Sequence, residues 1–165
     1  KANQDYIHIG VELNTSIFAI AMKKVVNDGV NNVKMLNIKA LDLPLHIKEN
    51  SISKLYLNFS DPWPQNGYRK RRLVHPIHLE VFEKFIKDGG QIIFKTDNFG
   101  LFEMGVKNFK IRNYQIDFIS YDYQTVKGDY VTEYESKFRA LNRPIHRIVA
   151  TINKDSLLPW GEAMK

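Results

Sequence analysis

Three carboxylates in this chain each follow a stretch of sequence that predicts a β-strand. Ligands of open α/β sheets bind outside the carboxyl ends of the strands, so the coincidence favours a ligand site over three separate helix caps. A carboxylate accepts two hydrogen bonds at once, and the base-pairing edge of guanine offers two neighbouring N–H donors that Asp61 or Asp97 could bind. The three residues are Glu12, Asp61 and Asp97.

The segment after Asp61 combines a rigid aromatic residue with a block of cations. Pro62 and Pro64 flank Trp63, and a stiff loop loses less entropy when it binds. The indole could stack on a base, a contact typically worth roughly 1–3 kcal/mol. The cations suit phosphate contacts. The alternatives are a buried turn with Trp63 as core filler, and a solvated charge run in which a cation pairs with a local acid. The cations are Arg69, Lys70, Arg71 and Arg72.

The composition is that of a globular chain with excess positive charge. Of its 165 residues, 44% are hydrophobic and 25% are charged, which is ordinary for one folded domain. No stretch is long and apolar enough to predict a membrane span, and the absence of cysteine excludes disulfides and is typical of a cytoplasmic protein. The net charge of +6 indicates an anionic partner. We expect no metal, because the histidines lack ligand spacing.

Segments that predict strands alternate with segments that predict helices. This alternation predicts an α/β fold with a mostly parallel sheet. Only a long polar loop separates the last two strands, so we expect them to pair antiparallel at an edge. We expect one domain over residues 1–152, followed by a tail over residues 153–165. The expected strands are residues 6–13, 33–38, 54–59, 91–96, 114–121 and 145–152, and the expected helices are residues 17–25, 76–87 and 100–109.

Five motifs in order resemble the bacterial tRNA (guanine-N7-)-methyltransferases, class I enzymes that use S-adenosylmethionine. The resemblance spans residues 1–152 and implies a Rossmann-like sheet whose last strands are antiparallel. It also implies a first strand with a glycine-rich cofactor loop, which we expect to be missing from this chain. The motifs are Leu57-Asn58-Phe59-Ser60-Asp61-Pro62-Trp63-Pro64, Lys70-Arg71-Arg72-Leu73, Phe94-Lys95-Thr96-Asp97-Asn98, Gly100-Leu101-Phe102-Glu103, and Thr132-Glu133-Tyr134-Glu135 with Lys137-Phe138.

The resemblance assigns a role to each matching position. It implies that Glu12 binds the cofactor ribose, that Asp61 serves both cofactor binding and catalysis, and that Asp97 binds the substrate. It places the late substrate-binding loop at residues 132–135, where a plain loop with a helix cap at Thr132 is the alternative. The residues of that loop are Thr132, Glu133, Tyr134 and Glu135.

The chain departs from the family pattern at the adenine and substrate positions. Lys39 stands where the family has an acid near the adenine, and a lysine cannot accept a hydrogen bond. Either Asp42 or the backbone of Ala40 replaces that acceptor, or cofactor affinity is weaker. Gln65 replaces a lysine at a substrate-binding position, and Gly67-Tyr68 replaces an arginine–histidine pair. These changes reduce the number of positively charged side chains near the expected substrate site.

The resemblance implies transfer of a methyl group from S-adenosylmethionine to N7 of the variable-loop guanine of tRNA. The expected partner is tRNA, and the protein is expected to be a monomer or a homodimer. Two other readings remain open: a non-catalytic tRNA-binding relative, and a class I methyltransferase with a different acceptor.

Overall fold

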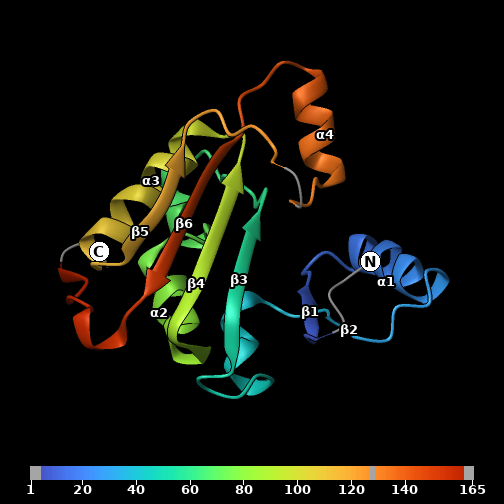
Figure 1. Cartoon of the computed structure of the whole chain (residues 1–165), viewed down its shortest axis with the longest axis horizontal. Coiled ribbons are helices and arrows are strands. Elements are labelled where there is room, and N and C mark those ends of the chain that lie inside the picture. The colour runs from blue at the N-terminus through green and yellow to red at the C-terminus, as the bar shows by residue number, and fades with distance from the viewer. Residues whose placement is uncertain (1–4, 127–128, 162–165) are drawn as a thin grey trace. The chain divides into compact units, whose positions relative to one another are not determined.

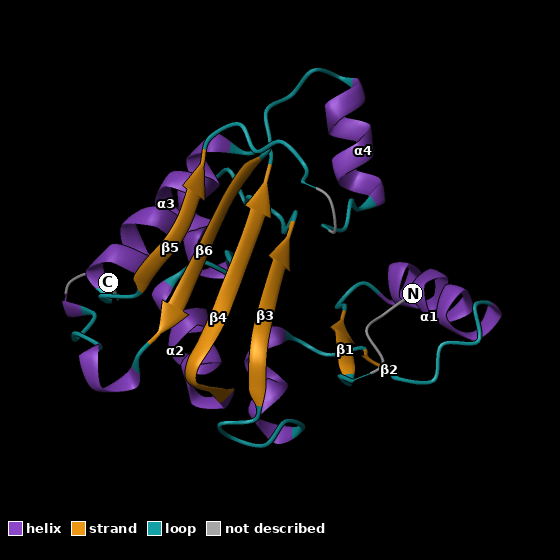
Figure 2. Ribbon diagram, viewed as in Figure 1, coloured by secondary structure: helices purple, strands orange, loops and turns teal. Residues whose placement is uncertain are grey.

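The computed structural model describes residues 5–126 and 129–161. It divides the chain into two compact units, Lys1–His46 and Ile47–Lys165, and each unit has its own sheet. Strands and helices alternate as the sequence predicts, but the strands form a two-stranded sheet and a four-stranded sheet (Figure 2).

The first unit is a small β-α-β arrangement. Strand β1 (His8–Val11) and strand β2 (Val33–Leu36) pair in parallel, with His8 opposite Val33. Helix α1 (Thr15–Asn27) connects them, and the 3-10 helix η1 (Ala40–Leu45) follows β2. The Asn14 side chain caps α1 by accepting hydrogen bonds from the Ser16 and Ile17 amides at 3.0 and 3.2 Å, which begins the helix directly after the strand.

The second unit holds a four-stranded sheet in the order β3-β4-β6-β5 (Figure 1). Strand β6 runs antiparallel to both of its neighbours, whereas β3 and β4 are parallel. The strands are β3 (Ile52–Asn58), β4 (Ile86–Thr96), β5 (Gln115–Ser120) and β6 (His146–Ile152). The helices are η2 (Asn66–Arg71), α2 (Pro76–Phe85), α3 (Phe99–Ile111), α4 (Glu133–Ala140) and η3 (Lys154–Ser156).

Helices α2 and α3 lie on one face of this sheet (Figure 1). Alternate residues of β6 are buried, as a strand with one face against a core requires. The core therefore lies between the sheet and these two helices, and it fixes where β3 and β4 end. Its fully buried residues include Phe82, Phe85, Phe94, Phe102, Phe109 and Ile148.

The sequence misplaced the junction between α2 and β4. The helix was expected through residue 87, but it ends at Phe85, and β4 begins at Ile86 rather than at residue 91. Ile86 is fully buried and pairs with Ile52. The register then shifts, with Gly89 at φ 70°, a backbone conformation that glycine adopts without strain. Gly89 and Gly90 predict that the helix ends just before them, but burial and pairing of Ile86 end it earlier.

The last two strands pair antiparallel as expected, with β5 at the edge and β6 inside the sheet. The polar loop between them contains α4, which the sequence did not predict as a helix. The described part of the expected tail packs on the unit: Trp160 is only 7% exposed, and the Leu158 amide donates to the Arg112 carbonyl at 3.2 Å. Across the described residues, no helix is both long enough and apolar enough to cross a membrane.

Candidate functional site

Asp61 and Asp97 follow two neighbouring parallel strands at the same edge of the sheet. In the register of β3 and β4, Asn58 lies opposite Lys95, and the Phe59 amide donates to the Lys95 carbonyl at 2.9 Å. Strands β3 and β4 therefore end side by side, with Asp61 three residues after Asn58 and Asp97 two residues after Lys95. This is the arrangement predicted from the sequence, and it creates an acidic edge at the carboxyl ends of β3 and β4.

The backbone around Asp61 is held in an unusual conformation. Phe59 and Trp63 have positive φ values of 50° and 41°, which bulky side chains rarely adopt because of steric strain. Asp61 between them is exposed. The hydroxyl of Ser60 is buried and has no hydrogen-bond partner among the described residues, and such a group is the kind that a ligand satisfies.

Trp63 lies in an aromatic and cationic cluster formed by its own loop. Its ring meets the Tyr68 ring edge-on at 5.9 Å. The Arg71 guanidinium lies over both rings, 4.9 Å from the Trp63 centroid and 4.5 Å from that of Tyr68. Trp63 is thus a half-buried loop residue rather than core filler, and Arg71 is orientated by cation–π contacts. Stacking of Trp63 on a base remains a prediction.

Arg72 differs from the other three cations because its side chain turns toward the loop. Its Nε and Nη2 both donate to the Trp63 carbonyl, at 3.3 and 2.9 Å, and its Nη1 lies 3.4 Å from Met104 Sδ. Burial, followed by the charge of Arg69, lowers the pKa of Arg72, which still leaves a guanidinium charged. The geometry makes Arg72 a clamp on the loop after Asp61.

Asp97 is a partly exposed acid at the end of β4. Its Oδ2 lies 3.4 Å from Arg143 Nη1, and the side chains are 19% and 58% exposed. Asn98, the next residue, caps α3 by accepting a hydrogen bond from the Leu101 amide at 2.8 Å. The neighbouring helix cap is therefore supplied by Asn98, and Asp97 faces an exposed cation, Arg143.

Thr132 and Glu135 of the late loop form hydrogen bonds that fix the start of α4. Thr132 Oγ1 accepts a hydrogen bond from the Glu135 amide at 3.0 Å and caps α4. The helix cap is therefore present, and substrate binding by this loop stays a prediction. Glu135 has a fully buried side chain. Its carboxylate accepts from Lys95 Nζ at 3.2 Å and Arg139 Nη2 at 2.7 Å. Glu133 and Tyr134 are exposed, so the accessible part of this loop is smaller than the motif suggested.

Lys95 is the centre of a charge network that the sequence did not reveal. Its Nζ donates to Asp129 Oδ2 at 3.0 Å as well as to Glu135, and Arg147 Nη1 also donates to Asp129 at 3.2 Å. A lysine among the buried residues of β4 was the available signal, since a buried charge needs a partner. The network joins β4 and β6 to the segment after β5.

Burial raises the pKa of the Asp129 carboxyl, but hydrogen bonds from Tyr123 and Lys95, with the charges of Lys95 and Arg147, outweigh burial and leave that pKa below its ordinary value. Glu135 behaves in the same way: burial raises its pKa, and hydrogen bonds from Arg139 and Lys95 lower it further than burial raises it. Both carboxylates therefore stay ionised and hold the segment by charge.

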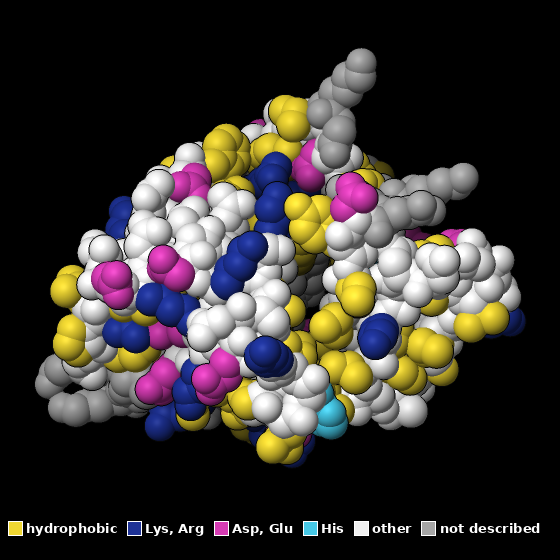
Figure 3. Space-filling view, turned by 60° about the horizontal axis from the view of Figure 1, so that its bottom comes forward, with side chains coloured by type: hydrophobic (Ala, Val, Ile, Leu, Met, Phe, Trp, Pro, Cys, Tyr) yellow, Lys and Arg dark blue, Asp and Glu magenta, His cyan; other side chains and the backbone are white. Residues whose placement is uncertain are grey.

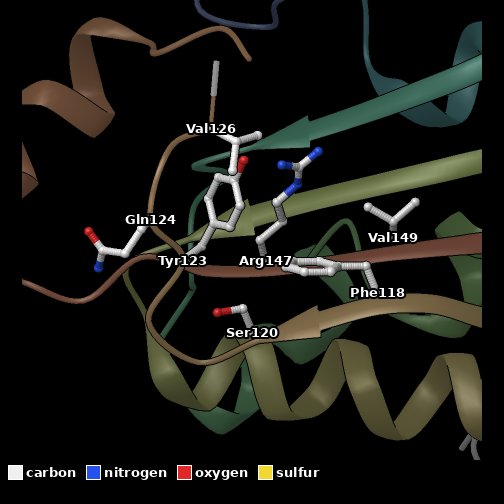
Figure 4. A pocket seen from close by; sticks show the side chains of 7 residues that line it. All are labelled: Phe118, Ser120, Tyr123, Gln124, Val126, Arg147 and Val149. Atoms are coloured by element: carbon white, nitrogen blue, oxygen red, sulfur yellow. The ribbon is translucent and has the colours of Figure 1, made fainter. Parts of the chain in front are cut away.

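Arg147 also borders a shallow apolar pocket of about 380 Å³ on the β5–β6 sheet (Figure 4). Its guanidinium lies 4.5 Å from the Tyr123 ring centroid and 5.7 Å from that of Phe118. Figure 4 shows the Arg147 side chain rising beside Tyr123, with Phe118 and Val149 along the sheet. Cation–π contacts with Phe118 and Tyr123 therefore orient the Arg147 guanidinium that binds Asp129.

A row of aromatic contacts connects the end of β3 to α4. The Phe59 ring stacks on Tyr134 at 6.3 Å and on Phe138 at 5.9 Å between centroids. Phe59 is one of the strained residues beside Asp61. The late loop and the loop after β3, far apart in the sequence, are therefore in direct contact, and this contact was not predicted.

In the first unit, Glu12 and Lys39 lie at the carboxyl ends of two paired strands. The Glu12 amide donates to the Leu36 carbonyl at 3.1 Å, and Glu12 Oε1 accepts from the Asn14 amide at 2.7 Å. Lys39 is exposed and immediately precedes η1. The Glu12 carboxylate is thus orientated through one oxygen, which suits it to accept hydrogen bonds from a diol through the other.

The remaining predicted residues are exposed. Arg69 and Lys70 have no ion pair within residues 5–126 and 129–161, and Gln65 precedes η2 with no side-chain capping bond. On the face seen in Figure 3, cations alternate with acids instead of forming one continuous patch. No group of three or more candidate ligands in the described residues could hold a metal ion.

Comparisons of the sequence with known proteins match it to methyltransferases. A family model described as "Putative methyltransferase" matches residues 1–148. A tRNA (guanine-N(7)-)-methyltransferase of Bacillus velezensis is 43% identical over 149 residues, covering 89% of this chain and 69% of the relative. The enzyme of the same name from Bacillus subtilis is 42% identical, with 89% and 70% covered.

The fold is also found in solved structures. The geranyl diphosphate C-methyltransferase of Streptomyces coelicolor, in complex with S-adenosyl-L-homocysteine, superimposes with a TM-score of 0.58 at 12% identity, covering 91% of this chain and 64% of that one. This likeness concerns the fold alone.

Proposed function

The chain belongs to the tRNA (guanine-N(7)-)-methyltransferase family, and on that premise we propose that it methylates N7 of the variable-loop guanosine of tRNA. The methyl donor is S-adenosylmethionine, and the proposed setting is the cytoplasm. We assign residues 1–152 to the methyltransferase domain. The observation that carries the proposed site is the exposed Asp61, held between two residues of positive φ beside an unsatisfied Ser60 hydroxyl.

The reaction is a nucleophilic substitution at a methyl carbon. S-adenosylmethionine supplies a sulfonium methyl group. The N7 lone pair of guanine forms the new N–C bond while the C–S bond breaks, and its electrons remain on sulfur. N7 carries no proton, so no strong general base is needed, and catalysis comes from positioning and electrostatics. The product ring is cationic.

Asp61 is the proposed catalytic residue. A carboxylate near the reacting guanine favours the positive charge that grows on the ring, and it can accept hydrogen bonds from the base-pairing edge. Asp97, which follows the neighbouring strand, is the proposed substrate-binding acid. Gln65 and the exposed residues Glu133 and Tyr134 are proposed to contact the RNA.

Glu12 and Lys39 are proposed to serve the cofactor within the first unit. The half-buried Glu12 carboxylate, fixed by the Asn14 amide, suits the ribose hydroxyls of a nucleoside. Lys39 is exposed and can donate only. Either Asp42 or the Ala40 backbone is proposed to supply the acceptor for the adenine amino group, or the cofactor binds more weakly.

Thr132 and Glu135 are proposed as positioning residues, which orient neighbouring residues of α4 and do not contact the substrate themselves. Glu135 is buried and fully engaged, so its proposed role is to hold α4 in place while Glu133 and Tyr134 contact the substrate. Arg69, Lys70 and Arg71 are the proposed phosphate contacts. Arg72 is proposed to support them by holding the loop.

The proposal is tested by methyl transfer from labelled S-adenosylmethionine to a tRNA transcript. We expect Asp61→Ala to lower the rate by about 100-fold or more, a typical loss for one electrostatic group, with an unchanged circular dichroism spectrum. Asp155→Asn is the control. This exposed acid follows the carboxyl end of β6, which is antiparallel to β4, so it lies at the other edge of the sheet from Asp61 and Asp97. Near-normal turnover of Asp61→Ala would refute the role of Asp61. Transfer to another acceptor with tRNA inert would refute the substrate.

A further inference from the structure

A polar groove of about 1020 Å³ lies between η2, the start of α2 and one face of α3. It belongs entirely to the second unit and is distinct from the edge that carries Asp61 and Asp97. Its volume is at the upper end for small-molecule sites, and its lining is mainly polar. The residues that matter for its chemistry are Arg69, Lys70, His75, Glu103, Lys107 and Trp160.

Three cations from two elements border this groove. Arg69 and Lys70 come from η2 and Lys107 from α3. All three are exposed, and none forms an ion pair with the part of the chain that the structure describes. Burial, then the charges of Lys70, Arg69 and Arg72, lowers the pKa of His75. The groove therefore has a positive potential that no carboxylate of the described chain neutralises through an ion pair.

Trp160, one of the lining residues, carries a hydrogen-bond donor without a described partner. Trp160 is 7% exposed, and its indole N–H is buried without an acceptor among the described residues. An unpaired buried donor costs roughly 1–3 kcal/mol, and a phosphate oxygen that reached this N–H would offset that cost. Among the described lining residues, Glu103 is the carboxylate, and it accepts a hydrogen bond from the Tyr121 hydroxyl at 2.8 Å.

The groove is connected to the candidate active site through Arg72. This side chain binds the Trp63 carbonyl in the loop after Asp61, and it contacts Met104, which lines the groove. The segment Asn66–Arg71 forms both the continuation of that loop and one wall of the groove. A single extended polyanion can therefore follow the surface from one to the other.

We propose that this groove binds the phosphodiester backbone of the tRNA substrate, at a stretch of RNA separate from the guanosine that is methylated. The proposal rests on the proposed function and adds Lys107 and Trp160 to its binding surface. Several unpaired cations spread around an open polar groove suit a backbone with repeated phosphates, since each neutralised phosphate releases counterions.

The test measures binding of the full chain to a fluorescein-labelled tRNA transcript by anisotropy, at salt concentrations from 50 to about 200 mM. Lys107→Ala is the main variant, and Lys110→Ala is its control, because Lys110 is an exposed lysine of the same helix outside the groove. We expect Lys107→Ala to weaken binding by about 3–10-fold and to reduce the salt slope by about 0.7–0.9. Lys110→Ala should match the wild type.

A second variant tests the buried donor without changing charge. Trp160→Phe removes the N–H and keeps a ring beside Arg112, whose guanidinium lies 5.4 Å from the indole. We expect weaker tRNA binding with an unchanged salt slope.

The outcomes separate the two proposals. If the wild type methylates tRNA but Lys107→Ala and Lys110→Ala have equal affinities and slopes, the groove proposal is overturned and the proposed function stands. If the wild type neither binds nor methylates tRNA, both are overturned. A loss of affinity in Lys107→Ala with methylation at saturating tRNA unchanged supports the groove as a site apart from the chemistry.

Discussion

Lys95 and Glu135 form a buried ion pair that joins β4 to α4, with Lys95 Nζ 3.2 Å from Glu135 Oε2 and side chains that are 5% and 0% exposed. The residues are 40 positions apart in the chain. The position of the late loop is therefore fixed by a charge inside the sheet, and the loop presents Tyr134 next to Phe59.

Glu135→Gln tests how strongly that charge holds α4. Removing the carboxylate leaves Lys95 and Arg139 without a shared anion in a buried setting, and breaking a buried pair in this way costs about 3 kcal/mol or more. We expect the thermal midpoint to fall by roughly 10 °C, measured by circular dichroism. Asp122→Asn, an exposed acid in the same connection, is the control. Equal midpoints for the two variants would contradict the network.

The pH dependence of stability should reflect the two depressed carboxyl pKa values. The pKa values of Asp129 and Glu135 lie below 3.8 and 4.5 in the folded chain, so unfolding takes up protons. Their contribution to the free energy of unfolding is present above about pH 5 and is lost as the pH falls through these ordinary values toward the folded ones. Denaturant titrations at a series of pH values from about 3 to about 7 give the free energy of unfolding at each pH and so measure this loss.

Two histidines must be separated from this effect. The pKa values of His75 and His78 are also lowered, mainly by burial, so their contribution falls as the pH drops below the ordinary 6.5. Asp129→Asn removes one carboxyl and leaves both histidines. It should flatten the curve below about pH 5 and leave the higher range unchanged. An identical acid limb in this variant would show that Asp129 does not carry the effect.

Arg72→Lys tests the clamp on the loop after Asp61. A lysine keeps the charge but cannot donate two fixed N–H groups to the Trp63 carbonyl while contacting Met104. Hydrogen bonds from charged groups contribute about 1.5–3 kcal/mol, so we expect kcat/KM for tRNA to fall by about tenfold or more. Arg69→Lys keeps its charge at an exposed position and should stay close to the wild type. Similar losses in both variants, which keep the positive charge, would contradict a role specific to the contact between Arg72 and the Trp63 carbonyl.

Phe59→Gly tests the stack between the end of β3 and α4. Glycine relieves the strain of φ 50°, worth about 1 kcal/mol, but it loses two aromatic contacts of about 0.5–1.5 kcal/mol each. We expect faster amide hydrogen exchange in Glu133–Ala140 with exchange in β6 unchanged. Phe59→Asn keeps a residue that tolerates positive φ and should show the same loss, because the stack is absent in both. Unchanged exchange in α4 would show that the stack does not order it.

The order of strands and helices, and the acids at the strand ends, could be read from the sequence because they depend on local patterns. Alternation of apolar residues predicted the strands, and Asp61 and Asp97 followed because both come directly after neighbouring strands. The same local reading failed at Ile86, where pairing with Ile52 and burial outweigh the glycines that follow.

Tertiary structure alone decided what the motif residues do. Sequence grouped Arg69–Arg72 as one cationic block and residues 132–135 as one loop, yet Arg72 and Glu135 are engaged within the protein while Arg69 and Tyr134 are exposed. Residue type sets which interactions a side chain can form. Burial and partners distant in the chain set which ones it does form, because a charge without water must find a counter-charge.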